Sequence, residues 1–414
     1  MKLQKSKKVI VVGGGASGII AAIAARRMGA EVKILERNPR IGKKILVTGN
    51  GRCNFTNIHA NVHDYSGENR EFVTGALSRF SIPETIAFFE KLGIAHKVED
   101  NGKVFPMSDQ ASSILDVLLY ELKVLGVNIV CGVYVSSIKK EGDGFLIETE
   151  GAGLFRCDRV VLACGGKAMP STGSDGNGYG LAKKLGHSTT EIFPALVQLK
   201  LEGKFFKQID GVKFVGAAAV VSGTKTIAKD RGDILFTNYG ISGPPILQIS
   251  RKAGELLQCG REALLQVTVL DNLDIKKLEE LLASRFNKMP HKTLEFALVG
   301  LINKRLIPVV LRQAGFSDLK VNAGSITSEQ ISRISKILKC WQFKIKGTKS
   351  WPSAQVTAGG IRTSEIDPGT LESKIVKGLF FAGEIIDIDG KCGGYNLQWA
   401  WSSGYVSGQS AAGQ

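Results

Sequence analysis

The stretch Val9-Ile-Val-Val-Gly-Gly-Gly-Ala-Ser-Gly18 decides the fold of this 414-residue chain. An apolar run is followed by glycines at positions 13, 15 and 18 and then by small and apolar residues. In such a pattern the first glycine permits a tight turn, the second lets backbone approach a pyrophosphate, and the third lets helix and strand pack closely. Glu36, which ends the next apolar run, is placed to accept hydrogen bonds from a ribose. Strand, turn, helix, strand and acid together predict a dinucleotide-binding site.

The composition is that of an ordinary globular protein, with 43% hydrophobic and 22% charged residues. The length predicts two or three domains. No segment reaches ~18 uninterrupted apolar residues, so we expect no membrane span and a cytoplasmic protein. The seven cysteines include no Cys-x-x-Cys pair, which indicates reduced thiols. The five histidines show no metal-ligand spacing, so we expect no metal site.

The positive charge of the chain is unevenly distributed. Of a net charge of +16, residues 196–351 contribute +12, from 25 Lys and Arg against 13 Asp and Glu. A solvated basic surface and an anionic macromolecular partner such as nucleic acid are both consistent with this excess.

Strand and helix patterns alternate up to residue 195, which is typical of an α/β domain. The spacing predicts a helix at 111–125, a strand at 127–135, a hairpin from 144–150 and 154–156, and a buried strand at 158–166. After residue 351, an apolar strand at 376–382 and a small-residue helix at 399–412 indicate that the chain rejoins the first domain.

The middle of the chain has a different pattern. Residues 196–270 contain short β-prone runs separated by glycines and predict a small barrel or sandwich. Residues 271–351 predict a helical subdomain, with helices at 277–286, 294–304 and 328–338. We therefore expect a first domain built from 1–195 and 352–414.

Five segments spread over the chain resemble the bacterial HI0933-like (YhiN-like) flavoprotein family. They are Gly42-Lys-Lys-Ile-Leu-Val-Thr-Gly-Asn-Gly-Arg-Cys-Asn54, Ala163-Cys-Gly-Gly166, 172–182, Ala354-Gln-Val-Thr-Ala-Gly-Gly360 and 383–404. The resemblance implies an α/β fold with a Rossmann-type FAD-binding domain of the two-dinucleotide-binding kind, interrupted by the barrel and helical regions. It also implies FAD as the cofactor.

The predicted FAD-binding residues lie in the glycine turn, at the ribose acid, in the loop after it, and at the glycine-rich ends of later strands. The loop amides and Arg52 suit the pyrophosphate and the flavin edge, and the amides that open the last helix suit negative charge on the flavin. The set comprises Gly13, Gly15, Ala16, Ser17, Gly18, Glu36, Arg37, Lys44, Thr48, Asn50, Gly51, Arg52, Cys53, Asn54, Val135, Ala163, Gly165, Gly166, Gly383, Glu384, Asp387, Gly394, Asn396, Leu397 and Gln398.

Three residues are candidates for catalysis: Cys392, Asn396 and Thr357. Cys392 precedes the last helix and could donate a proton or act as a redox thiol, because a helix amino terminus favours the thiolate. A small packing residue is the alternative interpretation of Cys392. Thr357 belongs to a run of small residues that would leave room for a substrate at the flavin face.

The absence of a second G-x-G-x-x-G predicts that NAD(P)H binds only transiently as electron donor. Members of the family are linked to reduction of activated C=C bonds, in uridine of large-subunit ribosomal RNA or in unsaturated steroid acids, and to amine oxidation. The basic region 196–351 favours ribosomal RNA, with a base extruded to reach the flavin. Its candidate contacts are Lys204, Lys207, Lys213, Arg251, Lys252, Lys304, Arg305, Lys344 and Lys346.

Two other functions remain open at this point. One is a small-molecule flavin oxidase or enone reductase, in which the basic region merely confers solubility. The other is a non-catalytic FAD-bound binding protein.

Overall fold

The computed structural model describes residues 6–413 and divides the chain into two compact units. The first unit comprises Met1–Pro194 and Gln355–Gln414, and the second comprises Ala195–Ala354. The chain therefore crosses between the units twice, after Pro194 and after Ala354.

The first unit is built on a five-stranded parallel sheet with the order β20-β11-β1-β2-β7. Its strands are β1 (Lys8–Val12), β2 (Glu31–Glu36), β7 (Asn128–Cys131), β11 (Arg159–Leu162) and β20 (Leu379–Phe381). Alternate residues of β1 enter two cores: Val9 and Val11 pack on one side of the sheet, and Ile10 and Val12 on the other. Burial on both faces explains why β1 reads as a continuous apolar run.

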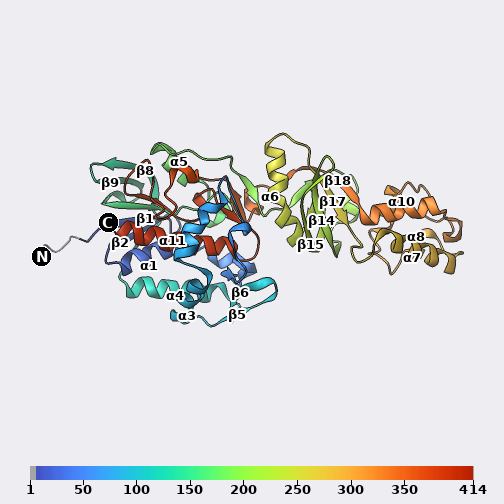
Figure 1. Cartoon of the computed structure of the whole chain (residues 1–414), viewed down its shortest axis with the longest axis horizontal. Helices are drawn as coiled ribbons and strands as arrows, with labels where there is room; N and C mark the ends of the chain where they lie inside the picture. The colour runs from blue at the N-terminus through green and yellow to red at the C-terminus, as the bar shows by residue number, and fades with distance from the viewer. Residues whose placement is uncertain (1–5, 414) are drawn as a thin grey trace. The chain divides into compact units, whose positions relative to one another are not determined.

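Helices cover one face of this sheet and a small antiparallel sheet covers the other (Figure 1). The helices are α1 (Ala16–Arg27), α4 (Ala111–Val124) and α11 (Tyr395–Ala412). The antiparallel sheet consists of β8 (Tyr134–Glu141), β9 (Gly144–Glu150) and β10 (Gly153–Cys157). The strand expected at 127–135 is divided, because Gly132 at φ +72° lies between β7 in the parallel sheet and β8 in the antiparallel one.

Shorter elements complete the first unit. The helices are α2 (Val73–Arg79), α3 (Ile82–Lys91) and α5 (Asn177–Lys184). The strands are β3 (Thr56–Asn57), β4 (Tyr65–Ser66), β5 (His96–Val98), β6 (Lys103–Pro106), β12 (Phe193–Ala195), β19 (Val356–Ala358) and β21 (Asp389–Gly390).

The second unit contains a closed six-stranded barrel with the order β13-β16-β15-β14-β17-β18. Its strands are β13 (Leu199–Leu201), β14 (Lys213–Ser222), β15 (Lys225–Thr237), β16 (Gly240–Ser242), β17 (Leu264–Thr268) and β18 (Trp341–Thr348). Its helices are α6 (Pro244–Gln258), α7 (Ile275–Lys288), α8 (Leu294–Ala297), α9 (Ile307–Gln313) and α10 (Ser328–Lys339).

Two features of the second unit differ from the sequence expectation. Region 271–351 is not wholly helical, because β18 returns after the helices and closes the barrel against β13 and β17. The helices α7 to α10 are thus inserted between two barrel strands. The helix expected at 294–304 ends at Ala297, and Gly300 at φ +83° follows in a conformation that a helix cannot continue.

Helices α1 and α11 approach so closely that two glycines of α11 touch the backbone of α1. A Cβ atom at Gly404 would lie 2.3 Å from the carbonyl oxygen of Ser17, and one at Gly408 would lie 2.2 Å from that of Ala21. Gly408→Ala should therefore force the helices apart and lower the free energy of unfolding by about 1–3 kcal/mol.

The matched control is Gly180→Ala in α5, where a Cβ would meet nothing within 4 Å. This substitution should be neutral or stabilising by about 0.5–1 kcal/mol, because alanine favours a helix interior. Chemical denaturation of both variants measures the difference. Equal stability of the two variants would mean that α1 and α11 can separate without cost.

Candidate functional site

The turn after β1 depends on glycines. Gly13 has φ +106°, and a Cβ there would lie 2.5 Å from the carbonyl oxygen of Ala163. A Cβ at Gly18 would lie 1.9 Å from the carbonyl oxygen of Gly13. Around Gly15, in contrast, the Cβ position has no atom within 4 Å, and α1 begins at Ala16 without a side-chain cap. The start of α1 is therefore uncapped and has open space beside Gly15, an arrangement that suits phosphate binding.

Glu36 ends β2 and is buried, with 8% of its surface exposed. Its Oε2 accepts a hydrogen bond from the Gly14 amide at 2.8 Å. Its Oε1 accepts two from Asn38, at 2.8 Å from the backbone amide and 2.7 Å from the side-chain amide. A carboxylate offers about four acceptor positions, so a position on Oε2 remains for a ribose hydroxyl.

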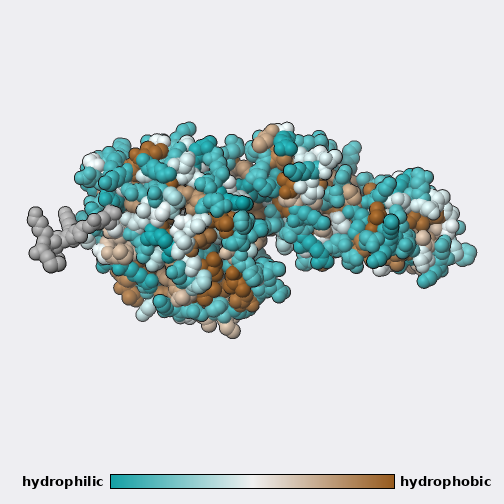
Figure 2. All heavy atoms as spheres, in the orientation of Figure 1, coloured by the Kyte–Doolittle hydropathy of each residue, from teal (hydrophilic) through white to brown (hydrophobic). Residues whose placement is uncertain are grey.

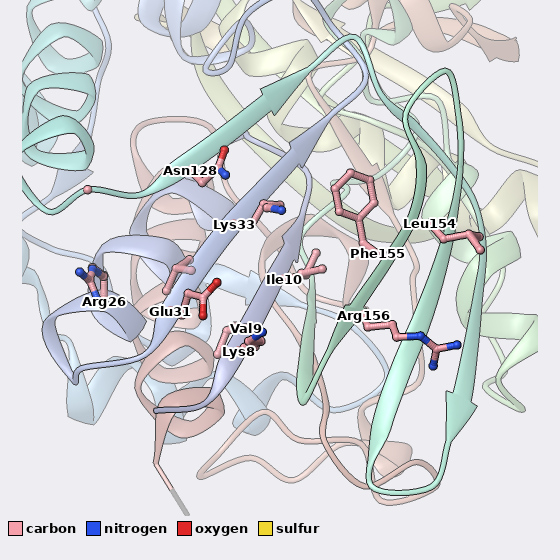
Figure 3. Close-up of a pocket in the computed structure, with 12 residues that line it drawn as sticks. Lys8, Val9, Ile10, Arg26, Glu31, Lys33, Asn128, Leu154, Phe155 and Arg156 are labelled. Carbon is pink, nitrogen blue, oxygen red and sulfur yellow. The ribbon is translucent and has the colours of Figure 1, made fainter. Parts of the chain in front are cut away.

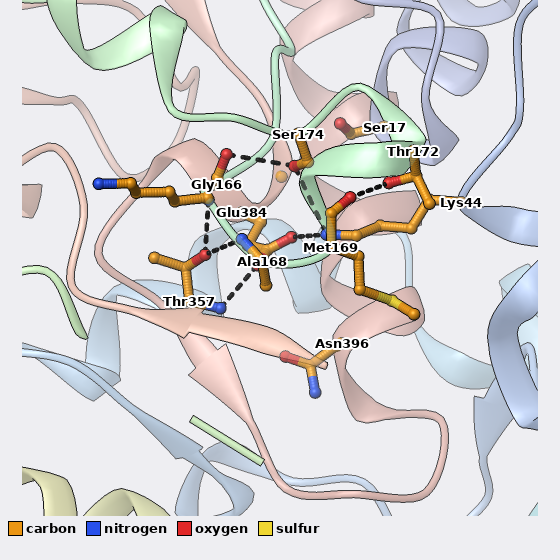
Figure 4. A network of polar contacts seen from close by, with 12 residues as sticks. Ser17, Lys44, Gly166, Ala168, Met169, Thr172, Ser174, Thr357, Glu384 and Asn396 are labelled. Carbon is orange, nitrogen blue, oxygen red and sulfur yellow. Dashed lines mark hydrogen bonds and ion pairs between the residues drawn. The ribbon is translucent and has the colours of Figure 1, made fainter. Parts of the chain in front are cut away.

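A polar network joins four separated segments of the first unit (Figure 4). The Lys44 Nζ lies 2.8 Å from Oε2 of Glu384, whose Oε1 accepts a hydrogen bond from the Thr357 amide at 2.7 Å. The Thr357 hydroxyl oxygen in turn accepts from the amides of Lys167 and Ala168, at 2.7 and 3.0 Å. This network fixes the loops that follow β11 and β20.

Ser174 belongs to the same network and was not among the predicted residues. Its hydroxyl donates to the Gly166 carbonyl at 3.2 Å and lies 3.5 Å from the Lys44 Nζ. Gly166 itself is required, because a Cβ there would lie 2.3 Å from the Thr357 hydroxyl oxygen. The signal for Ser174 was present in the sequence, since it lies in the motif Thr172-Gly-Ser-Asp that resembles the family.

Helix α11 begins after Gly394, which has φ +101° and provides no side-chain cap. Gly404 contacts Ser17, and Gly408, four residues later, contacts Ala21. Because residue numbers increase in the same direction along both helices, α11 runs parallel to α1. Because α11 starts nine residues before Gly404 and α1 starts one residue before Ser17, the first turn of α11 extends about 12 Å beyond the start of α1 at 1.5 Å per residue. The two uncapped helix starts can therefore face two different parts of one extended ligand.

A comparison with known protein families shows to which family the chain belongs. A family model described as the HI0933-like protein Rossmann domain matches residues 7–410. The chain belongs to the HI0933-like family. Its similarity to a 3-dehydro-bile acid delta(4,6)-reductase of Clostridium scindens is 42% identity, over 98% of this chain and 99% of the relative. A ribosomal RNA dihydrouridine synthase of Escherichia coli is 31% identical, over 97% of this chain and 96% of the relative.

Solved structures agree at the level of the fold. A 3-ketosteroid-delta4-(5alpha)-dehydrogenase of Rhodococcus jostii superposes with a TM-score of 0.51 at 18% identity, covering 100% of this chain and 99% of the other. Membership of the HI0933-like family, with its FAD-binding Rossmann domain, makes the chain an oxidoreductase.

The residues at the site fit an FAD. Uncapped amides at the start of α1, open space at Gly15 and a remaining acceptor position on Glu36 suit the pyrophosphate and the ribose. A second acceptor, the Asn54 Oδ1, is buried beside Gly394 and has no hydrogen-bond partner among the residues the structure describes.

The structure corrects the role of two residues at the beginning of α11. Gln398 is fully buried, and its amide nitrogen donates to Thr85 and Ser402 while its oxygen accepts from Thr56. Its side chain therefore joins elements of the fold and leaves no group for FAD. The Asn396 side chain accepts from the Gly390 amide at 2.8 Å and donates to its carbonyl at 2.9 Å, so it holds the preceding loop.

Thr357 was expected at the substrate face, but it is only 1% exposed and its hydroxyl oxygen already accepts two hydrogen bonds. These contacts make Thr357 a positioning residue of the Lys44–Glu384 network. The prediction that it acts in catalysis is not supported by its surroundings.

Arg52 also differs from the expectation. Its guanidinium donates to Asp109 at 2.6 and 2.8 Å and pairs with Glu99, and it lies 4.1 Å from the ring centre of Phe105. Hydrogen bonds from the Arg52 guanidinium hold the pKa of the Glu99 carboxyl below its usual range. Arg52 is therefore occupied by carboxylates and anchors its loop, whereas we had expected it to bind phosphate.

The other loop residues divide into buried and exposed groups. Cys53 is fully buried, and desolvation raises the pKa of its thiol to about 12, so it is a packing residue. Thr48 donates its hydroxyl to the Ile45 carbonyl at 2.7 Å. Asn50 and Gly51 are exposed at the tip of the loop, where both have positive φ.

The remaining predicted residues lie in or beside the same region. Arg37 pairs with Asp175. Asp387 is buried and accepts from the Glu68 amide at 2.9 Å. Val135 and Leu397 contribute to the cores on the two sides of the sheet.

Cys392 is half-buried in the loop before α11, with its Sγ 3.9 Å from Oε1 of Gln355. The seven cysteines are thiols and form no disulfide bonds among the residues that the structure describes. Within residues 6–413, no cluster of three or more His, Cys, Asp and Glu side chains could hold a metal ion. Over the same residues, no helix is both long and apolar enough to cross a membrane.

A pocket of about 470 Å³ lies away from these residues (Figure 3). It is lined by residues at the amino ends of the parallel strands, such as Lys8, Glu31 and Asn128, and by β10. The predicted site residues follow the carboxyl ends of the same strands, where α/β sheets bind ligands. This pocket is therefore not the cofactor site.

Glu36→Ala should weaken FAD binding roughly 10- to 100-fold, because it removes charged acceptors worth about 1.5–3 kcal/mol each. Flavin absorbance per polypeptide after desalting measures the loss. The control is Lys204→Ala, a truncation in the second unit that should leave flavin content unchanged. Equal flavin content in the two variants, both folded by circular dichroism, would refute the assignment of Glu36.

Proposed function

We propose that this protein uses FAD to reduce an activated C=C bond, with NAD(P)H as a transient electron donor. We further propose that its substrate is uridine in large-subunit ribosomal RNA. The names of the two full-length relatives support the reaction class, because a delta(4,6) bile-acid reductase and a dihydrouridine synthase both saturate a C=C bond conjugated to a carbonyl.

The site supports this chemistry through its positive helix ends. When bound, FAD supplies the hydride-transferring ring. The amides at the start of α1 would hold the pyrophosphate, and Glu36 would hold the ribose. The uncapped start of α11, further along the same ligand, would stabilise negative charge on the flavin ring. This uncapped start is the structural observation that supports flavin chemistry at the site.

The Lys44–Glu384–Thr357 network has a positioning role in this scheme. Glu384 connects the cation on the first loop with the backbone after the second crossing of the chain. Together with Thr357, Glu384 holds the loop after β11 and the loop after β20 at a fixed separation. These loops carry predicted site residues, so the network fixes their positions. Preorganisation of this kind lowers the cost of orienting a substrate.

Saturation of a C=C bond requires a hydride at one carbon and a proton at the other. We propose Cys392 as the proton donor, because its thiol is half-buried and lies beside the start of α11. The proton would pass from Sγ to the carbon next to the carbonyl, and the amides of α11 would stabilise the thiolate left behind.

Cys392→Ala should slow substrate reduction by about 10²- to 10⁴-fold, the usual contribution of a general acid. Flavin reduction by NAD(P)H should be unchanged, because it needs no proton at that carbon. Anaerobic stopped-flow measurements separate the two half-reactions. The matched control is Cys259→Ala at an exposed cysteine of the second unit. Unchanged rates of both half-reactions in Cys392→Ala would make Cys392 a packing residue.

The second candidate substrate is a small-molecule enone such as an unsaturated steroid acid. The 42% identity to the bile-acid reductase favours it. The net charge of +12 in residues 196–351 favours RNA instead, since an uncharged or singly charged ligand needs no such excess.

Anaerobically reduced enzyme should be reoxidised faster by protein-free large-subunit ribosomal RNA than by a steroid enone or by dioxygen. Deletion of the gene should remove dihydrouridine from that RNA, as measured by mass spectrometry of nucleosides. Faster reoxidation by the enone, together with unchanged dihydrouridine, would establish the small-molecule function instead.

A further inference from the structure

Four cations of the second unit form a surface patch from two segments of the chain. We define the patch as Lys204, Lys207, Lys304 and Arg305, all of which are exposed. The Nε of Arg305 donates to the carbonyl of Gln208 at 3.1 Å. This bond holds the turn before α9 against the 3-10 helix Phe206–Gln208, so the two pairs of cations lie on one surface.

Aromatic packing fixes the backbone beneath the patch. Phe206 is 2% exposed inside the barrel. Phe205 stacks on Trp341 of β18, with ring centres 5.8 Å apart and planes at 18°. The backbone next to Lys204 and Lys207 is therefore anchored in the barrel core.

Many other cations of the second unit are neutralised locally. Lys213 pairs with Asp233 at 2.9 Å, Lys346 with Glu202 at 3.2 Å, and Lys344 with Glu262 at 3.8 Å. Arg231 pairs with Asp271, and both Arg251 and Lys252 pair with Glu255.

The patch differs from these pairs, because none of its four side chains forms an ion pair with the residues that the structure describes. Of the carboxylates nearest in sequence, Glu202 is held by Lys346, and Asp210 is exposed beside the patch. The face of this unit that Figure 2 shows carries hydrophilic residues interspersed with smaller apolar areas. The patch therefore brings together four cations that are not paired with any described carboxylate, with Asp210 as the nearest unpaired acid in sequence.

We propose that this patch binds the sugar-phosphate backbone of RNA. The inference rests on the proposed function and identifies the surface that would hold the substrate. Four separate cations on an exposed surface suit a chain of phosphates, because each cation can contact a different phosphate. Backbone contacts of this kind position a nucleic acid without reading its sequence.

The test compares charge reversals of equal size. K204E/K207E and K304E/R305E change the patch, and K225E/K229E changes two exposed lysines of β15 in the same unit by the same charge. Each patch variant should weaken binding to a protein-free fragment of large-subunit ribosomal RNA by about tenfold or more. The slope of log K against log salt should fall by roughly 1.4–1.8 for two lost phosphate contacts. The control should change much less.

Equal loss of affinity in K225E/K229E would overturn the proposal, because binding would then follow total charge. Failure of the unaltered protein to bind the RNA fragment would also overturn it. If binding depends on the patch but uridine is not reduced, the patch proposal stands and the proposed substrate is wrong. FAD content and NAD(P)H-dependent flavin reduction should be unchanged in all variants, which shows that the first unit is intact.

Discussion

The close contact between α1 and α11 is the constraint on which the first unit depends. Two glycines of α11 let its backbone rest on the carbonyls of Ser17 and Ala21, which aligns the helices in parallel. The alignment is reinforced where Gly383 donates its amide to Ser403 at 2.9 Å and accepts from Trp399 at 3.2 Å. Because these contacts fix the register of the two helices, the distance between their uncapped starts is set by the nine residues of α11 that precede Gly404. A dinucleotide needs such a fixed spacing, with phosphate at one positive end and a flavin ring at the other.

The second unit interrupts the first, so two separate parts of the chain must be held together in the first unit. The network around Glu384 provides contacts between these parts. The chain returns after Ala354, and Thr357 is held almost at once by its amide on Glu384 and its hydroxyl under two loop amides. Lys44 completes the arrangement from the amino-terminal segment. Four segments distant in sequence are thus bound to one another at the carboxyl edge of the sheet. Thr357, which we had expected to act in catalysis, instead helps to hold the loops together at this edge of the sheet.

Local patterns predicted the glycine turn, Glu36, α4, the β9–β10 hairpin and the barrel, because each depends on neighbouring residues. Local patterns did not predict features that depend on contacts with residues distant in the sequence. Strand β18 belongs to the barrel only because β13 and β17 are available to it, and its sequence follows directly after helices. Gln398 and Arg52 carry groups that suit a cofactor, but Thr56, Thr85 and the acidic pair Glu99 and Asp109 occupy those groups. No spacing along the chain reveals such partners.

The charge of the second unit is also described incompletely by the sequence, because the sequence does not show which cations form ion pairs. This difference bears on function. A count over the sequence treats Lys213, Arg251 and Lys304 as equal contributions to a basic region. In the structure the first two are paired with Asp233 and Glu255, so part of their field is cancelled within a few ångströms. A polyanion responds to what remains after this pairing, since it must displace any carboxylate already bound. The total of +12 therefore overstates the charge that is left uncompensated, and only the ion pairs of the structure show which cations are already held by carboxylates.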